Sequence, residues 1–182
     1  KLFLKKLIRD ELKAFGDPGA VMKKLYFPEH HLSHAASAYY ASPFTDSAVL
    51  TIDGVGEWAT ASICHGKGKD LSILRELHFP HSLGLLYSAF TYFCGFRVNS
   101  GEYKVMGLAP YGTPRFADEI ASLVGPMGDG SVRVDAKRLR YYSPRVLRSG
   151  QLAGMFDGPP RHPDDEITQR DADLAASVQQ VV

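Results

Sequence analysis

The stretch that decides the fold is Ser47-Ala48-Val49-Leu50-Thr51-Ile52-Asp53-Gly54-Val55-Gly56-Glu57. Its first part, 47–52, is rich in apolar and β-branched residues, which predicts a strand. The aspartate and the two glycines that follow predict a tight turn. A second apolar segment, 59–64, begins soon after the turn, and a third, 71–78, follows another glycine-containing turn. We therefore expect an antiparallel meander of three strands.

Helices are expected on both sides of this meander, because apolar residues recur there at helical spacing and proline or glycine marks several of the ends. The predicted helices cover 2–15, 30–40, 83–94, 105–108, 115–123 and 164–182. Further short strands are predicted over 24–27, 132–134 and 139–142. Together these segments predict an α/β fold, with α+β as the alternative, in which a mixed sheet is flanked by helices.

The length and composition are those of a globular domain. The 182 residues are enough for one substantial core, and we expect a single domain over 1–182. Lys and Arg number 21 and Asp and Glu number 20, so the net charge is +1. This near balance argues against binding to nucleic acid or to an anionic membrane through a basic surface. No apolar run is long enough to cross a bilayer.

The two cysteines, Cys64 and Cys94, lie far apart and lack the spacing of a zinc knuckle. We expect both to be buried free thiols in a reducing compartment, which indicates a cytoplasmic location. The sequence starts without Met and stops inside a predicted helix. We therefore expect it to be part of a longer protein.

Two histidines, His30 and His34, are spaced four residues apart in a predicted helix. This spacing places both imidazoles on one face of the helix, one turn apart, where they can reach the same metal ion. Asp53, at the end of a strand, is a natural third ligand. Two histidines and a carboxylate suit Fe(II), Zn(II) or Mn(II) and leave coordination positions open. For the histidine pair alone, helix capping or a polar core is the alternative.

His31 lies between these two histidines in the sequence. It is displaced by about 100° around the helix from His30. We therefore expect its ring to point elsewhere if His30 and His34 converge.

The turn itself, Asp53-Gly54-Val55-Gly56-Glu57, is predicted to bind nucleotide. Glycines let the backbone approach a phosphate closely, and successive amide groups can form an anion-binding nest. An ordinary hairpin turn is the alternative. A glycine turn between two strands is typical of actin-like ATPase folds, whereas the Walker loop continues into a helix and carries a lysine that is missing here.

Further polar residues flank the apolar segment 83–94. His81 and Glu102 are candidates for acid–base catalysis, and a structural role is the alternative for both. Ser82, Ser88, Asn99 and Lys104 are predicted to line a pocket. The alternative is that Ser82 caps a helix and that Asn99 lies in a surface turn.

Four blocks of the sequence together resemble the NodU/CmcH family of O-carbamoyltransferases. They are EHHLSHAASAYY (29–40), LTIDGVGEW (50–58), LGLLY (83–87) and NSGEYKVMGLAPYG (99–112). The resemblance implies a two-part enzyme. A YrdC-like domain makes carbamoyl-adenylate from carbamoyl phosphate and ATP, and a Kae1-like domain passes the carbamoyl group to a hydroxylated small molecule or oligosaccharide.

The resemblance also implies what this chain contributes. It is similar to part of the Kae1-like domain, which has the actin/Hsp70 ATPase (ribonuclease H-like) fold, and the YrdC-like domain is absent. His30, His34 and Asp53 match ligands of iron in that family, and a further aspartate ligand is expected beyond Val182. Two alternatives stay open. One is another carbamoyl or threonylcarbamoyl transferase of the same superfamily, acting on tRNA or in hydrogenase maturation. The other is a non-catalytic nucleotide-binding module.

Overall fold

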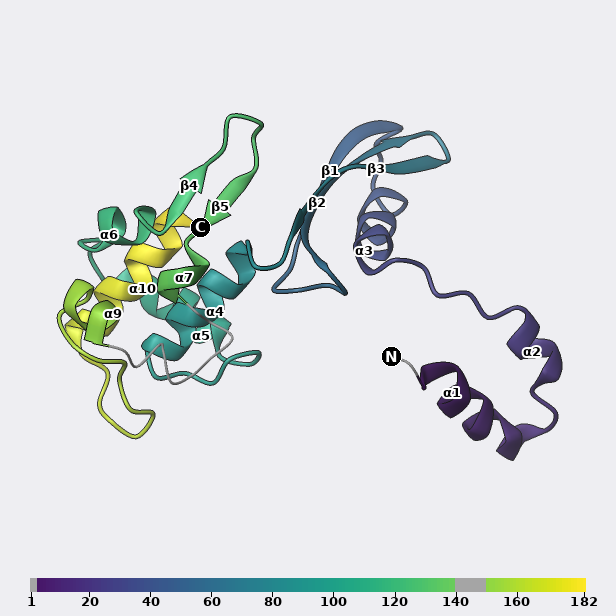
Figure 1. The fold of residues 1–182 in the computed structure, drawn as a ribbon, viewed down its shortest axis with the longest axis horizontal. Coiled ribbons are helices and arrows are strands. Elements are labelled where there is room, and N and C mark those ends of the chain that lie inside the picture. Colours follow the sequence, from purple (N-terminus) through teal and green to yellow (C-terminus); the bar gives the residue numbers. More distant parts are fainter. Residues whose placement is uncertain (1–2, 140–149) are drawn as a thin grey trace.

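The computed structural model describes residues 3–139 and 150–182 (Figure 1). A sheet with one helix against it connects an N-terminal pair of helices to a larger helical body. The elements are α1 (Leu4–Leu12), η1 (Lys13–Phe15), α2 (Gly19–Lys23), α3 (His30–Tyr39), β1 (Asp46–Ile52), β2 (Ala59–Lys67), β3 (Asp70–His78), α4 (Leu83–Phe93), α5 (Glu102–Leu108), η2 (Ala109–Tyr111), α6 (Ala117–Ala121), β4 (Val124–Pro126), β5 (Val132–Val134), α7 (Ala136–Leu139), α9 (Gly150–Met155) and α10 (Gln169–Val181).

The sheet is the antiparallel meander that the sequence predicts, in the order β1-β2-β3. Side chains alternate between its two faces, as they do in any strand. On β1, Val49 and Thr51 are buried, whereas Leu50 and Ile52 are exposed on the opposite face. A separate two-stranded sheet pairs β4 with β5. The mixed α/β class is therefore confirmed.

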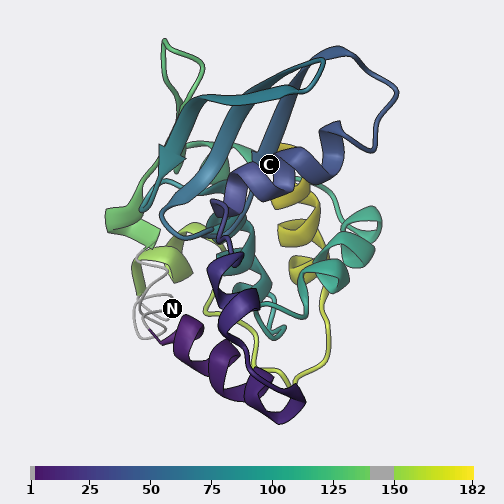
Figure 2. The ribbon, with the colours of Figure 1, turned by 90° about the vertical axis from the view of Figure 1, so that its right-hand side faces the viewer.

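Helix α3 lies against the buried face of the sheet (Figure 2). Ala35 and Tyr39 are its buried apolar residues, and they pack with Val49 and Cys64. A side chain at Gly66 would collide with the Tyr39 ring, because its Cβ would lie 2.5 Å from that ring. The small residue on β2 thus lets the helix approach closely and fixes its position on the sheet.

The main core lies in the helical body. Helices α4 and α10 contribute much of it, and Phe156 packs against Phe90 and Phe93 at ring-centroid distances of 5.3 and 5.5 Å. Both cysteines are buried and unpaired, as expected, and burial raises the pKa of the Cys94 thiol to about 12. Within residues 3–139 and 150–182, none of the helices combines the length and apolar character that a bilayer crossing requires.

The expected strand over 24–27 is wrong. That segment joins α2 to α3 without pairing to any described strand, and Tyr26 is 86% exposed. A strand needs a neighbour to accept and donate its backbone hydrogen bonds, and this segment has none. Of the expected strand over 139–142, Leu139 instead ends α7, and the rest lies outside the described residues.

Several helix boundaries also differ from the predicted ones. The last helix begins at Gln169 and not at residue 164, because Thr168 and Asp171 form a capping box that starts it there. Helix α5 begins three residues earlier than predicted, and α6 is confined to Ala117–Ala121. The core face of α10 does not include Ile167, which is 52% exposed.

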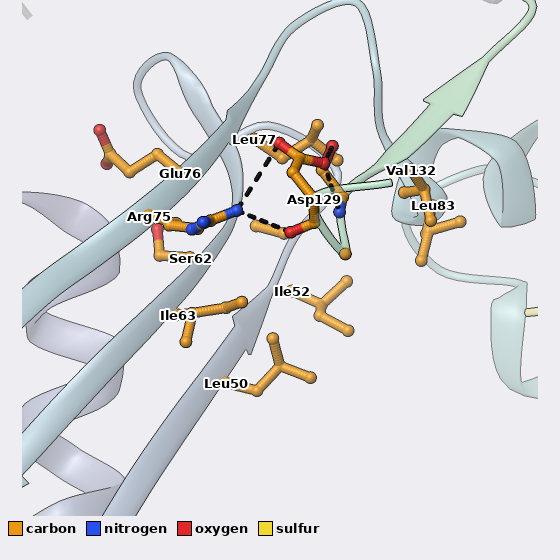
Figure 3. Close-up of a pocket in the computed structure, with 13 residues that line it drawn as sticks. Leu50, Ile52, Ser62, Ile63, Arg75, Glu76, Leu77, Leu83, Asp129 and Val132 are labelled. Carbon is orange, nitrogen blue, oxygen red and sulfur yellow. Dashed lines mark hydrogen bonds and ion pairs between the residues drawn. The ribbon is translucent and has the colours of Figure 1, made fainter. Parts of the chain in front are cut away.

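An apolar groove of about 590 Å³ lies on the exposed face of the sheet, opposite α3 (Figure 3). Leu50, Ile52 and Ile63 form its floor. Arg75 donates a hydrogen bond of 2.6 Å to the backbone oxygen of Asp129 in the β4–β5 turn, which closes one side. His30 and His34 do not line this groove.

Candidate metal centre

His30 and His34 stand in the first turns of α3, which begins directly after the extended residue Glu29. Their Nε2 atoms are 3.0 Å apart. The four-residue spacing therefore brings the two imidazoles together, as predicted. Both side chains are half-exposed, at 43% for His30 and 52% for His34.

Asp53 brings a carboxylate to the same point from the end of β1. Its Oδ2 atom lies 2.6 Å from Nε2 of His30 and 3.2 Å from Nε2 of His34. The backbone holds it there, because its amide donates a 2.8 Å hydrogen bond to the carbonyl of Thr60 on β2. Asp53, which is 19 residues after His34, thus joins the two histidines in one cluster, in which all three potential ligand atoms lie within 4.8 Å of one another.

The donor atoms of His30, His34 and Asp53 fit a divalent transition metal. Two ligands that each lie about 2.1 Å from one ion, at a right angle, are about 3 Å apart. The separations of 2.6, 3.0 and 3.2 Å are close to that value. Two imidazoles and a carboxylate suit Fe(II), Zn(II) or Mn(II). The partial exposure of all three side chains leaves room for further ligands.

His31 has a different environment from its two neighbours. It is only 2% exposed, and its Nδ1 atom lies 2.7 Å from the hydroxyl of Ser62 and 2.8 Å from that of Thr51. Burial lowers its pKa, and the nearby charge of Asp53 opposes this effect only in part. The Nδ1 side of its ring thus faces the sheet, whereas His30 and His34 converge on Asp53. The sequence did not single out the two hydroxyl residues that hold it.

Gly56 makes close packing around the histidines possible. A Cβ atom at this position would lie 2.4 Å from the His30 ring and 2.7 Å from the His31 ring. The amide of Gly56 donates a 2.9 Å hydrogen bond to the carbonyl of Ala59, so it is already used within the turn. At Gly54, in contrast, the nearest contact of an added Cβ would be an ordinary 3.7 Å, to Leu85.

The rest of the predicted nucleotide turn is open to solvent. Val55 is 44% exposed and Glu57 is also exposed. The nucleotide-binding role of residues 53–57 stays a prediction.

Ser82 caps α4, as the alternative interpretation had it. Its hydroxyl accepts a 3.0 Å hydrogen bond from the amide of Leu85 and donates one of 2.6 Å to the carbonyl of Gly54. The side chain is fully buried, so it does not face a space that an acceptor molecule could enter. Gly84 lets the start of α4 approach the backbone of Asp53 closely, because a Cβ there would lie 2.5 Å from the carbonyl oxygen of Asp53.

Glu102 joins Ser88 and Asn99 in a second polar group, at the start of α5. Its carboxylate accepts hydrogen bonds from the amides of Asn99 and Gly101, at 2.9 and 3.2 Å, and from the Ser88 hydroxyl at 3.0 Å. Burial alone would raise the pKa of Glu102, but these hydrogen bonds outweigh it and lower the pKa below its usual value. Such a carboxylate is a weak base.

Two further candidates, His81 and Lys104, lie apart from this group. Nδ1 of His81 is 3.3 Å from the amide nitrogen of Val134 on β5. The ammonium group of Lys104 lies 5.8 Å from the centre of the Phe96 ring. Within the described part of the chain, no hydrogen bond or ion pair joins either residue, or the Glu102 group, to His30 or His34.

Replacing Glu102 by glutamine is expected to lower the free energy of unfolding at pH 7 by about 1–2 kcal/mol, because hydrogen bonds to a charged acceptor contribute about 1.5–3 kcal/mol and the amide keeps part of them. Since the folded pKa of Glu102 is lowered, its stabilisation is complete above the pKa of the unfolded chain and is lost as the pH falls through the folded pKa. Urea denaturation of the full-length protein should therefore show a difference from wild type that shrinks with acidification. The exposed Glu166, changed to glutamine, is the control. A difference that persists unchanged at low pH would contradict this role.

Comparison with known proteins gives the cluster its context. The sequence matches the family described as Carbamoyltransferase N-terminus over residues 1–182. It is 49% identical over 183 aligned positions to the uncharacterized protein sll1178 of Synechocystis sp., which covers all of this chain and 30% of that protein. It is 35% identical to nodulation protein NolNO of Sinorhizobium fredii, over all of this chain and 25% of that protein.

A third relative, nodulation protein NolO of Bradyrhizobium diazoefficiens, is 34% identical over 84% of this chain and 26% of its own length. The chain thus spans 25–30% of the length of these three relatives. The match to the family extends over every residue of the sequence. The resemblance inferred from the four sequence blocks is confirmed, and the chain belongs to the carbamoyltransferase family.

Proposed function

We propose that this chain is part of an ATP- and carbamoyl-phosphate-dependent O-carbamoyltransferase. In this proposal the carbamoyl group passes from carbamoyl-adenylate to a hydroxyl of a small-molecule or oligosaccharide acceptor. The observation that carries the proposal is the convergence of His30, His34 and Asp53, with all three ligand atoms within 4.8 Å, in a chain of the carbamoyltransferase family. The separations of 2.6, 3.0 and 3.2 Å also suit hydrogen bonds, so metal analysis is what distinguishes a metal site from a hydrogen-bonded cluster.

His30, His34 and Asp53 would hold a divalent metal, which we propose to be Fe(II). When bound, such an ion supplies Lewis-acid stabilisation of charge on the phosphate of the adenylate. The protein groups fix the ligand positions. The two imidazoles are carried by one helix, and the carboxylate is fixed by the β1–β2 pairing that ends at Asp53. Preorganised ligands of this kind avoid the cost of rearrangement during the reaction.

The turn at residues 53–57 is proposed to contact the nucleotide. It carries Asp53, and it runs close to α3, since an added Cβ at Gly56 would collide with the rings of His30 and His31. Because the amide of Gly56 is already bonded to Ala59, the amides of Gly54 and Val55 are the stronger candidates for a phosphate contact. Orientation of the reacting groups by such contacts is a large part of catalysis in group transfer.

Activation of the acceptor hydroxyl is proposed for His81 in preference to Glu102. The pKa of Glu102 is lowered by its three hydrogen bonds, which makes it a poor proton acceptor. His81 is only half-buried, and its ring keeps one nitrogen besides the Nδ1 that contacts Val134. Ser88, Asn99 and Lys104 stay the proposed pocket for the acceptor or the carbamoyl group.

The direct test uses the full-length protein with carbamoyl phosphate, ATP and a panel of hydroxylated acceptors. We expect one or more acceptors to gain a carbamoyl group, with AMP released only when acceptor is present. Metal analysis of the purified protein should find one divalent ion per chain, and a chelator should stop transfer. Metal binding without transfer to any hydroxyl would favour another member of the superfamily, such as a threonylcarbamoyl transferase. If the protein neither binds a metal nor transfers a carbamoyl group, the non-catalytic nucleotide-binding module is the alternative that stays.

A further inference from the structure

His31 has a feature that the proposed function does not use. Its Nε2 atom is buried and has no hydrogen-bond partner among residues 3–139 and 150–182. The nearest charged oxygen is Oδ2 of Asp53, at 3.8 Å. A buried polar atom without a partner is costly, so proteins seldom leave one in place without a use for it. This atom points toward the carboxylate that the metal would share.

The two hydroxyls on the other side of the ring determine which nitrogen carries the proton. Thr51 on β1 and Ser62 on β2 are cross-strand neighbours, and both are buried. Each has the Nδ1 atom of His31 as its hydrogen-bond partner, and within the described residues neither hydroxyl has another. An unprotonated Nδ1 has one lone pair and accepts the proton of one hydroxyl, whereas a protonated Nδ1 would leave both hydroxyl protons without an acceptor among the described residues. Nδ1 is therefore the acceptor, and Nε2 carries the hydrogen.

The ring is also prevented from turning away. Gly56 packs against its Nε2 edge so closely that an added Cβ would lie 2.8 Å from Nε2 itself. The two hydroxyls hold the opposite edge. The Nε2–H group is thus fixed in direction, and Asp53 Oδ2 is the acceptor it faces.

We infer that His31 is a positioning residue whose Nε2–H group holds the Asp53 carboxylate for the metal. The inference rests on the proposed metal site. A hydrogen bond of about 2.9 Å requires the carboxylate to lie about 1 Å nearer than the present 3.8 Å. A hydrogen bond of this kind, from outside the ligand set, orients a ligating carboxylate and typically changes metal affinity about 10- to 100-fold. His31 would not itself be a ligand, because a ligating nitrogen must be free of its proton.

The first experiment observes the tautomer directly. Nitrogen-15 labelling of histidine in the full-length protein, with and without Zn²⁺, allows the ring nitrogens to be read by NMR, and the His31→Phe variant assigns the signal. We expect Nδ1 to be unprotonated and Nε2 to be protonated in both samples. A proton on Nδ1, or loss of the Nε2 proton when Zn²⁺ binds, would overturn the inference.

The second experiment measures affinity for Zn²⁺ by calorimetric titration of the full-length protein. Glutamine can place an amide N–H near the position of Nε2, whereas asparagine cannot reach it. We expect His31→Asn to weaken Zn²⁺ binding about 10- to 100-fold and His31→Gln to retain most of it. Equal affinities for the two folded variants would contradict the positioning role.

His30→Ala separates this inference from the proposed function. If His30→Ala leaves Zn²⁺ affinity unchanged, the metal site itself is wrong. If His30→Ala abolishes binding while His31→Asn binds as well as wild type, only the role of His31 fails. The NMR sample without Zn²⁺ reports the tautomer of His31 whether or not the metal site exists.

Discussion

Replacing His34 by alanine in the full-length protein is expected to abolish carbamoyl transfer while leaving ATP-dependent adenylate formation intact. His34 would supply one of the three proposed ligand atoms, and its Nε2 lies 3.0 Å from that of His30 and 3.2 Å from Asp53. Divalent-metal affinity should fall by more than about 100-fold. The reason is that loss of a residue that only hydrogen-bonds to a metal ligand already lowers metal affinity about 10- to 100-fold. The two activities are measured as acceptor carbamoylation and as pyrophosphate release.

His65 provides the matched control for this variant. Its Nε2 contacts a carboxylate oxygen of Asp46 at 2.8 Å, so it forms the same kind of pair at the far end of the sheet, without a second histidine. His65→Ala should leave metal binding and transfer at wild-type levels. Loss of both transfer and adenylate formation in a folded His34→Ala protein would contradict the division of labour. If the His34→Ala protein keeps the metal content of the wild type, the proposed metal site is wrong.

Replacing Gly56 by alanine is expected to weaken metal binding about 10- to 100-fold without unfolding the protein. The new Cβ would lie 2.4 Å from the His30 ring and 2.7 Å from the His31 ring, distances at which the rings must move. Because His30 is a proposed ligand, displacement of its ring would change the separation of the three candidate ligand atoms. Titration with Zn²⁺ or anaerobic Fe²⁺, together with thermal unfolding, measures both effects.

Gly54→Ala is the control, two residues away in the same turn. There the added Cβ meets only Leu85, at an ordinary 3.7 Å, so metal affinity should change by less than about threefold. Equal losses in the two variants would show that the turn, and not the contact with the imidazoles, sets the affinity. If both variants keep the metal affinity of the wild type, the histidine rings adjust freely to the added Cβ atom.

The convergence of His30, His34 and Asp53 could be predicted from sequence because each of its determinants is local. The spacing of His30 and His34 is fixed by helix geometry, and the position of Asp53 is fixed by the end of an apolar strand. The meander was predictable for the same reason, since apolar residues and turn residues alternate along 47–78. The resemblance of four ordered blocks then supplied the family.

The surroundings of the cluster could not be predicted in this way. Thr51 and Ser62 meet at His31 only because β1 and β2 pair in one particular register, and a shift of one residue in either strand would turn the hydroxyl of that strand to the other face. The need for glycine at position 56 likewise depends on how closely α3 approaches the turn. Both are properties of packing between segments, which a local pattern does not contain.

The hydrogen bonds of Ser82 have a consequence for the position of the Asp53 carboxylate. The backbone at Asp53 is held from two sides, because its amide bonds to Thr60 on β2 and its carbonyl accepts a hydrogen bond from the Ser82 hydroxyl at the start of α4. The same hydroxyl bonds to the carbonyl of Gly54, and Gly84 lets the two segments approach closely. The carboxylate therefore owes its place partly to a buried hydroxyl group that contacts neither His30 nor His34.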